Sequence, residues 1–105
     1  MIVIETTSDS KKKLKSISTQ LLEDKLAACT QITKISNSSY IWKGKLESKK
    51  EYKMVIKTIQ KNEKKIIETI KKTHNYKVFE LSKYKVSNLN KEYEGWVNNS
   101  LSKDN

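Results

Sequence analysis

The chain contains no arginine and no proline, and it has only two glycines, one histidine and one cysteine. All 22 basic residues are therefore lysines, and the formal net charge is +10. A basic surface attracts phosphate without sequence preference, whereas base-edge and bidentate phosphate recognition favours the guanidinium fork that lysine lacks. The chain also has no glycine-rich phosphate loop, zinc-finger spacing or aromatic RNA-binding motif. We therefore interpret the lysines as a solvated surface and keep a basic nucleic-acid-binding module as an alternative function.

The single cysteine, Cys29, excludes a disulfide within the chain. A free thiol fits a reducing compartment. The segment from Met1 to Glu5 has no basic start, and its apolar run is too short for a secretory signal. No stretch approaches the roughly 20 apolar residues of a membrane-spanning helix. We expect a soluble, cytoplasmic protein without a membrane partner.

The length of 105 residues is typical of one domain with a modest core, and we expect residues 1–105 to form a single domain. Hydrophobic residues make up 35% of the chain and charged residues 32%, which is polar for a globular protein. A chain of this polarity gains stability by burying additional surface against copies of itself.

The beginning of the chain predicts a strand followed by a helix. The segment Met1–Thr6 is short and rich in β-branched residues, which favours a strand. It is followed by residues that commonly begin helices, namely Ser8, Asp9 and Ser10. Apolar residues then recur at helical spacing to about Leu26, so we expect an amphipathic helix with its lysines facing water.

The residues from Ala28 to Thr58 predict a long pair of strands. A bend is expected at Ser36–Ser39, and a hairpin turn at Lys43–Lys45, where glycine supplies a positive φ. This region is too long for the strands of about 5–6 residues found in ordinary small sheets. A hairpin that projects from the subunit exposes an edge that another chain would have to cover. Alternatively, Tyr40 and Trp42 fill the core of their own chain.

The remainder predicts a helix, a strand and a short helix. We expect Thr58 to cap the second helix, which ends near Thr73, and Lys77–Val86 to form a strand. Asn88 or Asn90 then caps the last helix. Its apolar stripe consists of Leu89, Tyr93, Trp96 and Val97, and we expect Tyr93 and Trp96 to lie in the core rather than to line a ligand site.

The predicted order is strand, helix, two long strands, helix, strand and short helix, with a frayed end over residues 102–105. This order fits a βαβ–βαβ sandwich of the α+β class, in which helices cover one face of the sheet.

Five segments in this order resemble the CutA family of divalent-ion tolerance proteins. They are Leu26-Ala27-Ala28-Cys29, the run from Ser39 to Lys45, Ile56-Lys57-Thr58, His74-Asn75-Tyr76 and Tyr93-Glu94-Gly95-Trp96. The resemblance extends from Ile2 to about Leu101. It implies a ferredoxin-like antiparallel fold and a homotrimer in which the long hairpin reaches neighbouring subunits. It also implies a role in tolerance of divalent metals, copper above all, or sensing of a small ligand as in PII signalling proteins. It implies no enzymatic activity and no required cofactor.

The chain departs from the family pattern around His74. Two prolines that the family usually carries are replaced, by Asn75 and by Phe79. Some bacterial relatives hold copper with a cysteine of the first strand and a pair of histidines. The corresponding positions here are Glu5 and Thr73-His74. Only His74 keeps its ligand type, with Glu5 the weaker candidate, so we expect weak Cu(II) binding at most.

The candidate ligand pocket combines residues of the matched segments, namely Cys29, Trp42, Lys57, Tyr76 and Glu80. Lys57 and Glu80 fall inside predicted strands, where an unpaired charge is costly. An ion pair between them, within the chain or across subunits, would satisfy both. The alternative is that both are ordinary charges on a sheet surface.

Cys29 and His74 each allow a chemical and a structural interpretation. Cys29 is a possible soft metal ligand or nucleophile, or simply a small apolar side chain. His74 ends a predicted helix, whose dipole favours the imidazolium form, and it could instead anchor a loop by hydrogen bonding. An enzyme with Cys29 as nucleophile and His74 as base requires the two side chains to lie within hydrogen-bond reach.

Overall fold

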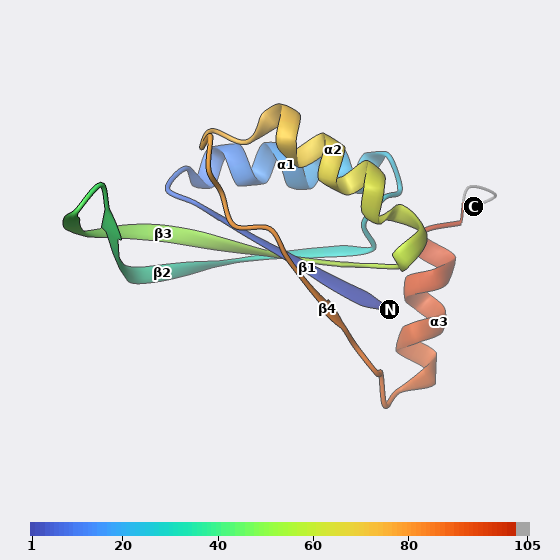
Figure 1. The fold of residues 1–105 in the computed structure, drawn as a ribbon. Coiled ribbons are helices and arrows are strands. Elements are labelled where there is room, and N and C mark those ends of the chain that lie inside the picture. Colours follow the sequence, from blue (N-terminus) through green and yellow to red (C-terminus); the bar gives the residue numbers. More distant parts are fainter. Residues whose placement is uncertain (103–105) are drawn as a thin grey trace.

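The computed structural model describes residues 1–102 as a four-stranded antiparallel sheet with two helices packed on one of its faces (Figure 1). Residues 103–105 of the expected frayed end lie outside this range. The elements are β1 (Ile2–Ser8), α1 (Lys11–Glu23), β2 (Cys29–Trp42), β3 (Lys45–Thr58), the 3₁₀ turn η1 (Gln60–Asn62), α2 (Glu63–Thr73), β4 (Ser82–Lys85) and α3 (Lys91–Ser100). The strand order is β2-β3-β1-β4. The predicted α+β, ferredoxin-like architecture is confirmed.

The core lies between the sheet and the two long helices. Side chains of β1 alternate between buried and partly exposed, because successive residues of a strand point to opposite faces. Helix α1 begins after Ser10, whose hydroxyl accepts a hydrogen bond from the Lys13 N–H at 3.1 Å. The fully buried apolar residues of this core are Ile4, Leu14, Ile17, Leu21, Met54, Ile56, Ile66 and Ile70. Each such side chain contributes about 1.5–3 kcal/mol by its burial, which fixes the helices on this face.

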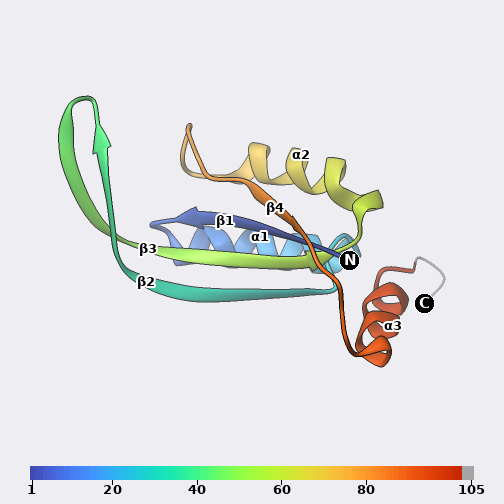
Figure 2. The same cartoon turned by 60° about the horizontal axis from the view of Figure 1, so that its bottom comes forward.

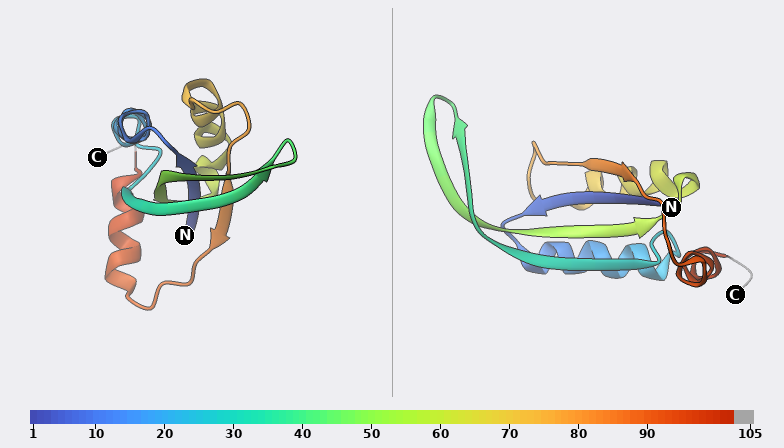
Figure 3. Two further views of the ribbon diagram at one scale, coloured as in Figure 1. Left: turned by 90° about the vertical axis from the view of Figure 1, so that its left-hand side faces the viewer. Right: turned by 90° about the horizontal axis from the view of Figure 1, so that it is seen from below.

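The β2–β3 hairpin extends well past the rest of the sheet and curls as it does so (Figures 2 and 3). The two strands turn through Lys43 and Gly44, both with positive φ, of 50° and 79°. The pairing register shifts between Ile35 and Ser38, which places a β-bulge where the sequence predicted a bend. A bulge adds one residue to one strand and bends it, so the bulge explains the curl.

The predicted start of the second helix is wrong. Thr58 is the last residue of β3, and its hydroxyl donates to the Leu26 carbonyl at 2.6 Å. The chain then makes a 3₁₀ turn before α2 begins at Glu63, and Asn62 donates to the same carbonyl at 3.2 Å. Because the Thr58 hydroxyl is hydrogen-bonded to the loop that follows α1, it does not cap a helix.

The predicted strand from Lys77 to Val86 is also too long. Only Ser82–Lys85 pairs with β1, and the pairing stops at Glu5. Beyond that point the Thr7 carbonyl accepts a hydrogen bond from the His74 ring at 2.9 Å. A side chain thus replaces the strand at this edge of β1, and residues 77–81 run as irregular backbone.

Helix α3 lies at the end of the molecule opposite the hairpin turn (Figures 1 and 3). Asn90 caps it by accepting from the Glu92 N–H at 3.0 Å. Val97 is fully buried, but Trp96 is 49% exposed and Leu89 is completely exposed. The prediction that Tyr93 and Trp96 lie in the core is therefore wrong for Trp96, whereas Tyr93 is partly buried.

Candidate functional site

A pocket of about 600 Å³ lies between the bulged part of the hairpin and the segment that follows α2. It is lined by Thr7, Tyr40, Trp42, Glu47, Lys49, Glu51, Tyr76, Lys77, Val78, Phe79 and Glu80. Its residues come from β1, β2, β3 and the irregular segment, so only the folded chain assembles it.

The sheet register explains why the strand residues share one face. Glu47, Lys49 and Glu51 alternate along β3, and side chains two apart on a strand point to the same side. Tyr40 lies directly opposite Glu47 on β2. Met54 is an even-numbered residue of β3 whose side chain points toward the helices, whereas Glu47, Lys49 and Glu51 are odd-numbered and point the opposite way. These pocket residues therefore lie on the continuation of the sheet face that α1 and α2 leave uncovered.

Glu51 is the most deeply buried charged residue of the pocket, with 7% of its surface exposed. The Tyr76 hydroxyl donates to its Oε2 at 2.7 Å. Burial, followed by this hydrogen bond to Glu51, raises the pKa of Tyr76, so its phenol stays protonated at neutral pH. Tyr76 therefore covers the carboxylate as a hydrogen-bond donor.

Lys49 brings a positive charge to the same cluster. Its Nζ lies 4.4 Å from the centroid of the Tyr76 ring and 6.0 Å from that of Tyr40, which is cation–π geometry. Its ion pair is with Asp9, at 4.0 Å, and both side chains are substantially exposed. An ammonium and a carboxylate thus face one pocket without pairing with each other.

His74 holds the segment that forms the pocket wall. Its Nε2 donates to the Thr7 carbonyl at 2.9 Å, and its Nδ1 accepts the Tyr76 N–H at 2.9 Å. The ring also stacks on Phe79, with centroids 4.4 Å apart. Burial lowers the pKa of His74, so the expected imidazolium form is wrong and the neutral ring is the native one. The expected loop-anchoring role is confirmed, and neither ring nitrogen keeps a lone pair for a metal ion.

Asn75 compensates for the proline that the family usually has at this position. Its side-chain oxygen accepts the Ser8 hydroxyl at 2.5 Å, and its amide donates to Asp9 at 2.8 Å. These bonds tie the loop after α2 to the corner between β1 and α1. Where proline would restrict the loop by fixing φ, this chain restrains it through the side-chain hydrogen bonds of Asn75.

The predicted pocket residues divide into two groups. Trp42, Tyr76 and Glu80 line the pocket together. Cys29 and Lys57 are paired with each other across β2 and β3, at the far end of the sheet. There the Lys57 Nζ lies 5.6 Å from the centroid of the Tyr93 ring, at the α3 end of the molecule.

Because the two groups are far apart, the single chain forms neither the Lys57–Glu80 ion pair nor the Cys29–His74 catalytic pair that the sequence suggested. Glu80 accepts the Ser82 hydroxyl at 3.1 Å, and no ion pair joins it to Lys57 within residues 1–102. Cys29 and Lys57 lie level with Val3 of β1, whereas His74 bonds Thr7, four residues or about 13 Å further along. A Cys29–His74 catalytic pair is therefore not formed.

The residues matching the copper ligands of some bacterial relatives do not form a site within one chain. Glu5 lies 3.7 Å from the Lys53 Nζ in an ion pair, and both nitrogens of His74 are already used. Within residues 1–102, no three His, Cys, Asp or Glu side chains are grouped so as to hold a metal ion.

The sequence interpretation missed Lys49 and Glu51 as pocket residues. The alternation of Glu47, Lys49 and Glu51 on a strand is a signal that could have placed them on one face. Nothing in that alternation indicates that Tyr76, 25 residues later, would bury Glu51.

Comparison with known proteins agrees with the fold. The family model described as CutA1 divalent ion tolerance protein matches residues 2–100. The divalent-cation tolerance protein CutA of Thermotoga maritima is 34% identical over 101 residues, covering 96% of this chain and 99% of that protein. CutA of Escherichia coli O139:H28 is 31% identical over 100 residues, or 95% of this chain and 89% of its own.

Solved structures give the same result. CutA1 from Pyrococcus horikoshii superposes with a TM-score of 0.90 at 27% identity, over 98% of this chain and 100% of that one. The periplasmic divalent cation tolerance protein CutA from Archaeoglobus fulgidus has a TM-score of 0.90 at 29% identity, over 97% and 100%. No helix within residues 1–102 is both long enough and apolar enough to span a membrane.

Proposed function

This chain belongs to the CutA1 family of divalent ion tolerance proteins, a family of tolerance proteins rather than of enzymes, and we propose that it acts as a cytoplasmic homotrimer in the response to divalent metal ions. Its relatives are named for divalent-cation tolerance. The cytoplasmic location is supported by the free cysteine. The Archaeoglobus relative is described as periplasmic, so cell fractionation is the direct test.

The β2–β3 hairpin is the observation that carries the proposal of self-association. Its tip exposes Ile41 at 66%, Trp42 at 48% and Leu46 at 76%. It extends the molecule to 49 Å, and the radius of gyration is 14.9 Å, compared with about 13 Å for a compact chain of this length. An apolar, projecting hairpin with an open edge strand is an aggregation hazard unless another chain covers it. Copies of the same chain are the partners that the family resemblance implies.

Sedimentation equilibrium at micromolar concentration tests the trimer. We expect a single species of three times the 12.2 kDa chain mass. A stable monomer under those conditions contradicts the proposal.

Copper binding by the isolated subunit is expected to be weak, because Glu5 is paired with Lys53 and His74 has no free nitrogen. Calorimetric titration with Cu(II) tests this expectation. Tight binding that survives His74→Ala would show that the metal uses a different site, formed by other residues or between subunits. The tolerance role proposed here therefore does not depend on a copper site within one chain.

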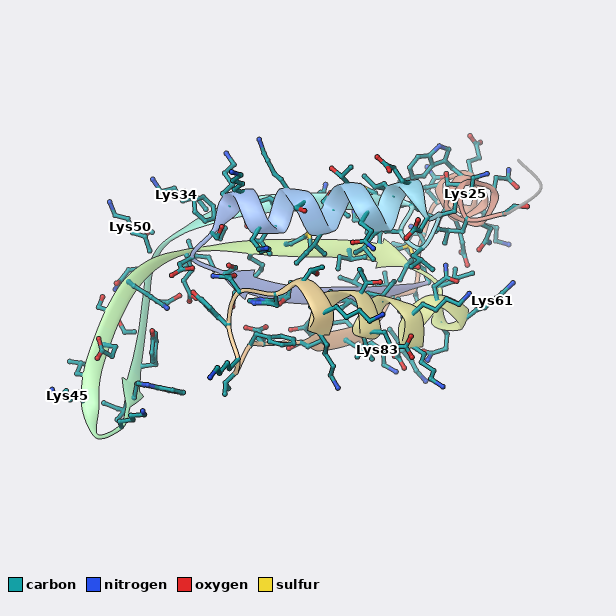
Figure 4. The ribbon with its side chains drawn as sticks, turned by 90° about the horizontal axis from the view of Figure 1, so that it is seen from above. Lys25, Lys34, Lys45, Lys50, Lys61 and Lys83 are labelled. Carbon is teal, nitrogen blue, oxygen red and sulfur yellow. The ribbon has the colours of Figure 1, made fainter. Side chains whose placement is uncertain are left out.

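Small-ligand sensing, as in PII signalling proteins, is the second candidate, and the 600 Å³ pocket favours it. Nucleic-acid binding has less support, because it needs one contiguous basic face. Figure 4 shows labelled lysines at both ends of the molecule, with Lys45 and Lys50 on the hairpin and Lys25 and Lys61 at the end where α3 lies. Binding of duplex DNA that weakens steeply with salt would contradict this ranking.

A further inference from the structure

Helix α1 begins with an unusual concentration of positive charge. Between Asp9 and Glu23 the chain has four lysines and no acidic residue, and all four lysines lie in the first five positions of the helix. Cations are unfavourable at this end of a helix, and Lys11 and Lys15 have the four-residue spacing at which like charges repel. Helix stability therefore does not account for these lysines.

Strands β2 and β3 bring two more lysines to the same place. The Lys11 Nζ lies 6.0 Å from the centroid of the Tyr52 ring, and Tyr52 packs against the core beneath the helices. Lys34 is the cross-strand partner of Tyr52, and Lys50 lies two residues before Tyr52 on β3. These side chains therefore share the face of the sheet that carries the helices. Figure 4 shows Lys34 and Lys50 close to each other on the hairpin, beside the start of α1.

The exposed lysines at this place form what we call the α1 lysine cluster, which consists of Lys11, Lys12, Lys15, Lys34 and Lys50. No ion pair joins any of them to a carboxylate of residues 1–102. Asp9 is engaged by Lys49 and Asn75. Glu47 and Glu51 line the pocket on the other face of the sheet. Five ammonium groups thus lie together without a counter-charge from the described part of the chain.

The lysines of α2 provide the contrast. Lys64 precedes Glu68 by four residues and Lys72 follows it by four, so opposite charges are neighbours on that helix. Glu63, at the start of α2, pairs with Lys83 at 2.6 Å. The positive charge of α2 is partly compensated within the chain, whereas that of the α1 lysine cluster is left for an external anion.

Burial of the hairpin tip in the proposed trimer leaves the α1 lysine cluster accessible. Lys34 precedes Ile41 of the apolar tip by seven residues, which is about 23 Å of strand, and Lys50 follows Leu46 by four residues, or about 13 Å. The other three lysines of the cluster lie on the helix layer. Ammonium groups without a counter-charge are costly to bury, so an interface between copies of the chain would exclude them.

The chemistry of the cluster favours a chain of phosphate groups. A lysine ammonium is a point charge that pairs with phosphate without the fixed fork geometry of arginine. Binding of single-stranded nucleic acid uses aromatic rings on which bases stack, and binding to a lipid surface uses an apolar face. The exposed large apolar and aromatic side chains of residues 1–102 lie elsewhere, the first along α1 being Leu22, seven residues after Lys15.

We propose that the α1 lysine cluster binds inorganic polyphosphate, a linear anion that has neither bases nor acyl chains. Successive phosphate groups pair with the ammonium groups of α1 and, across the sheet, with those of Lys34 and Lys50. The bound anion relieves the repulsion among the lysines at the start of α1. The inference depends neither on the trimer nor on the pocket.

Calorimetric titration of the full chain with inorganic polyphosphate, in the absence of divalent ions, tests the proposal. We expect saturable binding that weakens between about 50 and 200 mM salt. The slope of log affinity against log salt should be about −3.5, because five phosphate contacts release counter-ions as they do on a single strand. Poly(dT) and vesicles of phosphatidylserine and phosphatidylcholine are the alternative partners. Each should bind about tenfold or more weakly at equal phosphate concentration, because the cluster offers no ring for bases and no apolar face for lipid.

Two triple variants distinguish a local site from attraction by net charge. The cluster variant carries Lys12→Gln, Lys15→Gln and Lys34→Gln. The α2 variant carries Lys61→Gln, Lys64→Gln and Lys71→Gln. Each replaces three exposed lysines and so lowers the formal net charge from +10 to +7. The cluster variant should bind polyphosphate about tenfold or more weakly, with a salt slope shallower by about 2, whereas the α2 variant should stay within about twofold of the parent chain. Equal losses in the two variants overturn the proposal.

The remaining outcomes are separated by the same samples. Urea denaturation should show the cluster variant to be no less stable than the parent chain, because its lysines are unfavourable at the start of α1. The salt slope of the parent chain reports the number of contacts without any substitution. Poly(dT) or vesicles that bind as tightly as polyphosphate overturn the assignment of the partner. Absence of polyphosphate binding at about 150 mM salt overturns the site.

Discussion

His74 shows how one side chain can define a loop. Its two ring nitrogens join the Thr7 carbonyl to the Tyr76 N–H, and its ring stacks on Phe79. These contacts need one proton on the ring, at Nε2. A second proton would replace the Nδ1 acceptor with a donor facing the Tyr76 N–H.

We predict that His74 makes the protein less stable as the pH falls below about 6.5, the ordinary value of a histidine. Burial lowers the pKa of His74 in the folded state, so the unfolded chain takes up the proton first. The stabilisation is fully present above the unfolded value and is lost as the pH falls through the folded value. Urea denaturation at pH 7.5 and 5.5 measures it. His74→Gln, which does not titrate, should show a smaller decrease over this interval, and equal decreases contradict the prediction.

The Tyr76–Glu51 bond is the second test at this scale. Tyr76→Phe removes the hydroxyl that donates to the carboxylate of Glu51, a residue that is only 7% exposed. A buried acceptor left without its partner costs about 1–3 kcal/mol, so the free energy of unfolding should fall by about that amount. Tyr84→Phe is the control, because Tyr84 is 52% exposed, and its effect should be close to zero. A null effect of Tyr76→Phe would mean that water replaces the phenol.

The sequence identified Tyr76 as a pocket residue but missed Glu51 and Lys49. Tyr76 was predicted because it lies in the segment His74-Asn75-Tyr76, which resembles the family. Glu51 looks like an ordinary surface charge in the sequence, because its burial results from a segment 25 residues away. Local pattern cannot reveal burial that a distant loop creates.

Among the elements, the hairpin turn and α3 give a matched pair of glycine tests. Gly44 has φ of +79° and Gly95 lies inside α3, and a Cβ at either position would have nothing within 4 Å. Steric clash therefore plays no part, and backbone preference alone decides the outcome.

We predict that Gly44→Ala and Gly95→Ala have opposite effects. Gly44→Ala should destabilise by about 1 kcal/mol, because a left-handed conformation is unfavourable for residues with a Cβ. Gly95→Ala should stabilise by about 0.4–1 kcal/mol, because alanine favours the helix and restricts the unfolded chain. Thermal or urea denaturation measures both. The same sign for the two variants would contradict the assigned turn or helix.

The element boundaries that the sequence missed have a common cause. Thr58 resembles a helix cap, but its hydroxyl is engaged by Leu26. Residues 77–81 resemble a strand, but His74 occupies the edge of β1 that they would have joined. In both cases a contact between distant segments overrides the local preference. The existence of α1 and α2 and the end of α2 at Thr73 were predicted correctly, because their apolar residues recur at helical spacing.

At the scale of the whole molecule, the hairpin is the feature that a solitary chain does not explain. It carries half-exposed Trp42 and largely exposed Leu46 away from the core. We predict that the double substitution Trp42→Ser and Leu46→Ser shifts the sedimenting mass from three chains to one at micromolar concentration. The physical reason is the loss of the apolar area that the proposed trimer would bury.

Leu89→Ser is the control for this prediction. Leu89 is completely exposed and precedes α3, which begins at Lys91. Helix α3 lies at the end of the molecule opposite the hairpin turn (Figure 1). Leu89→Ser should leave the sedimenting mass unchanged. If the hairpin variant also keeps the mass of three chains, the hairpin tip does not hold the assembly together.

The sequence alone determined the class of the fold, its two long helices, the hairpin and its turn, and the resemblance that the family match bears out. These depend on periodicity and on residues near one another in the chain. The tertiary structure decided which candidate residues meet. The antiparallel register places Cys29 beside Lys57 at one end of the sheet, while His74 draws the segment from Tyr76 to Glu80 against the hairpin at the other. The pocket depends on that long-range geometry, which no local spacing in the sequence encodes.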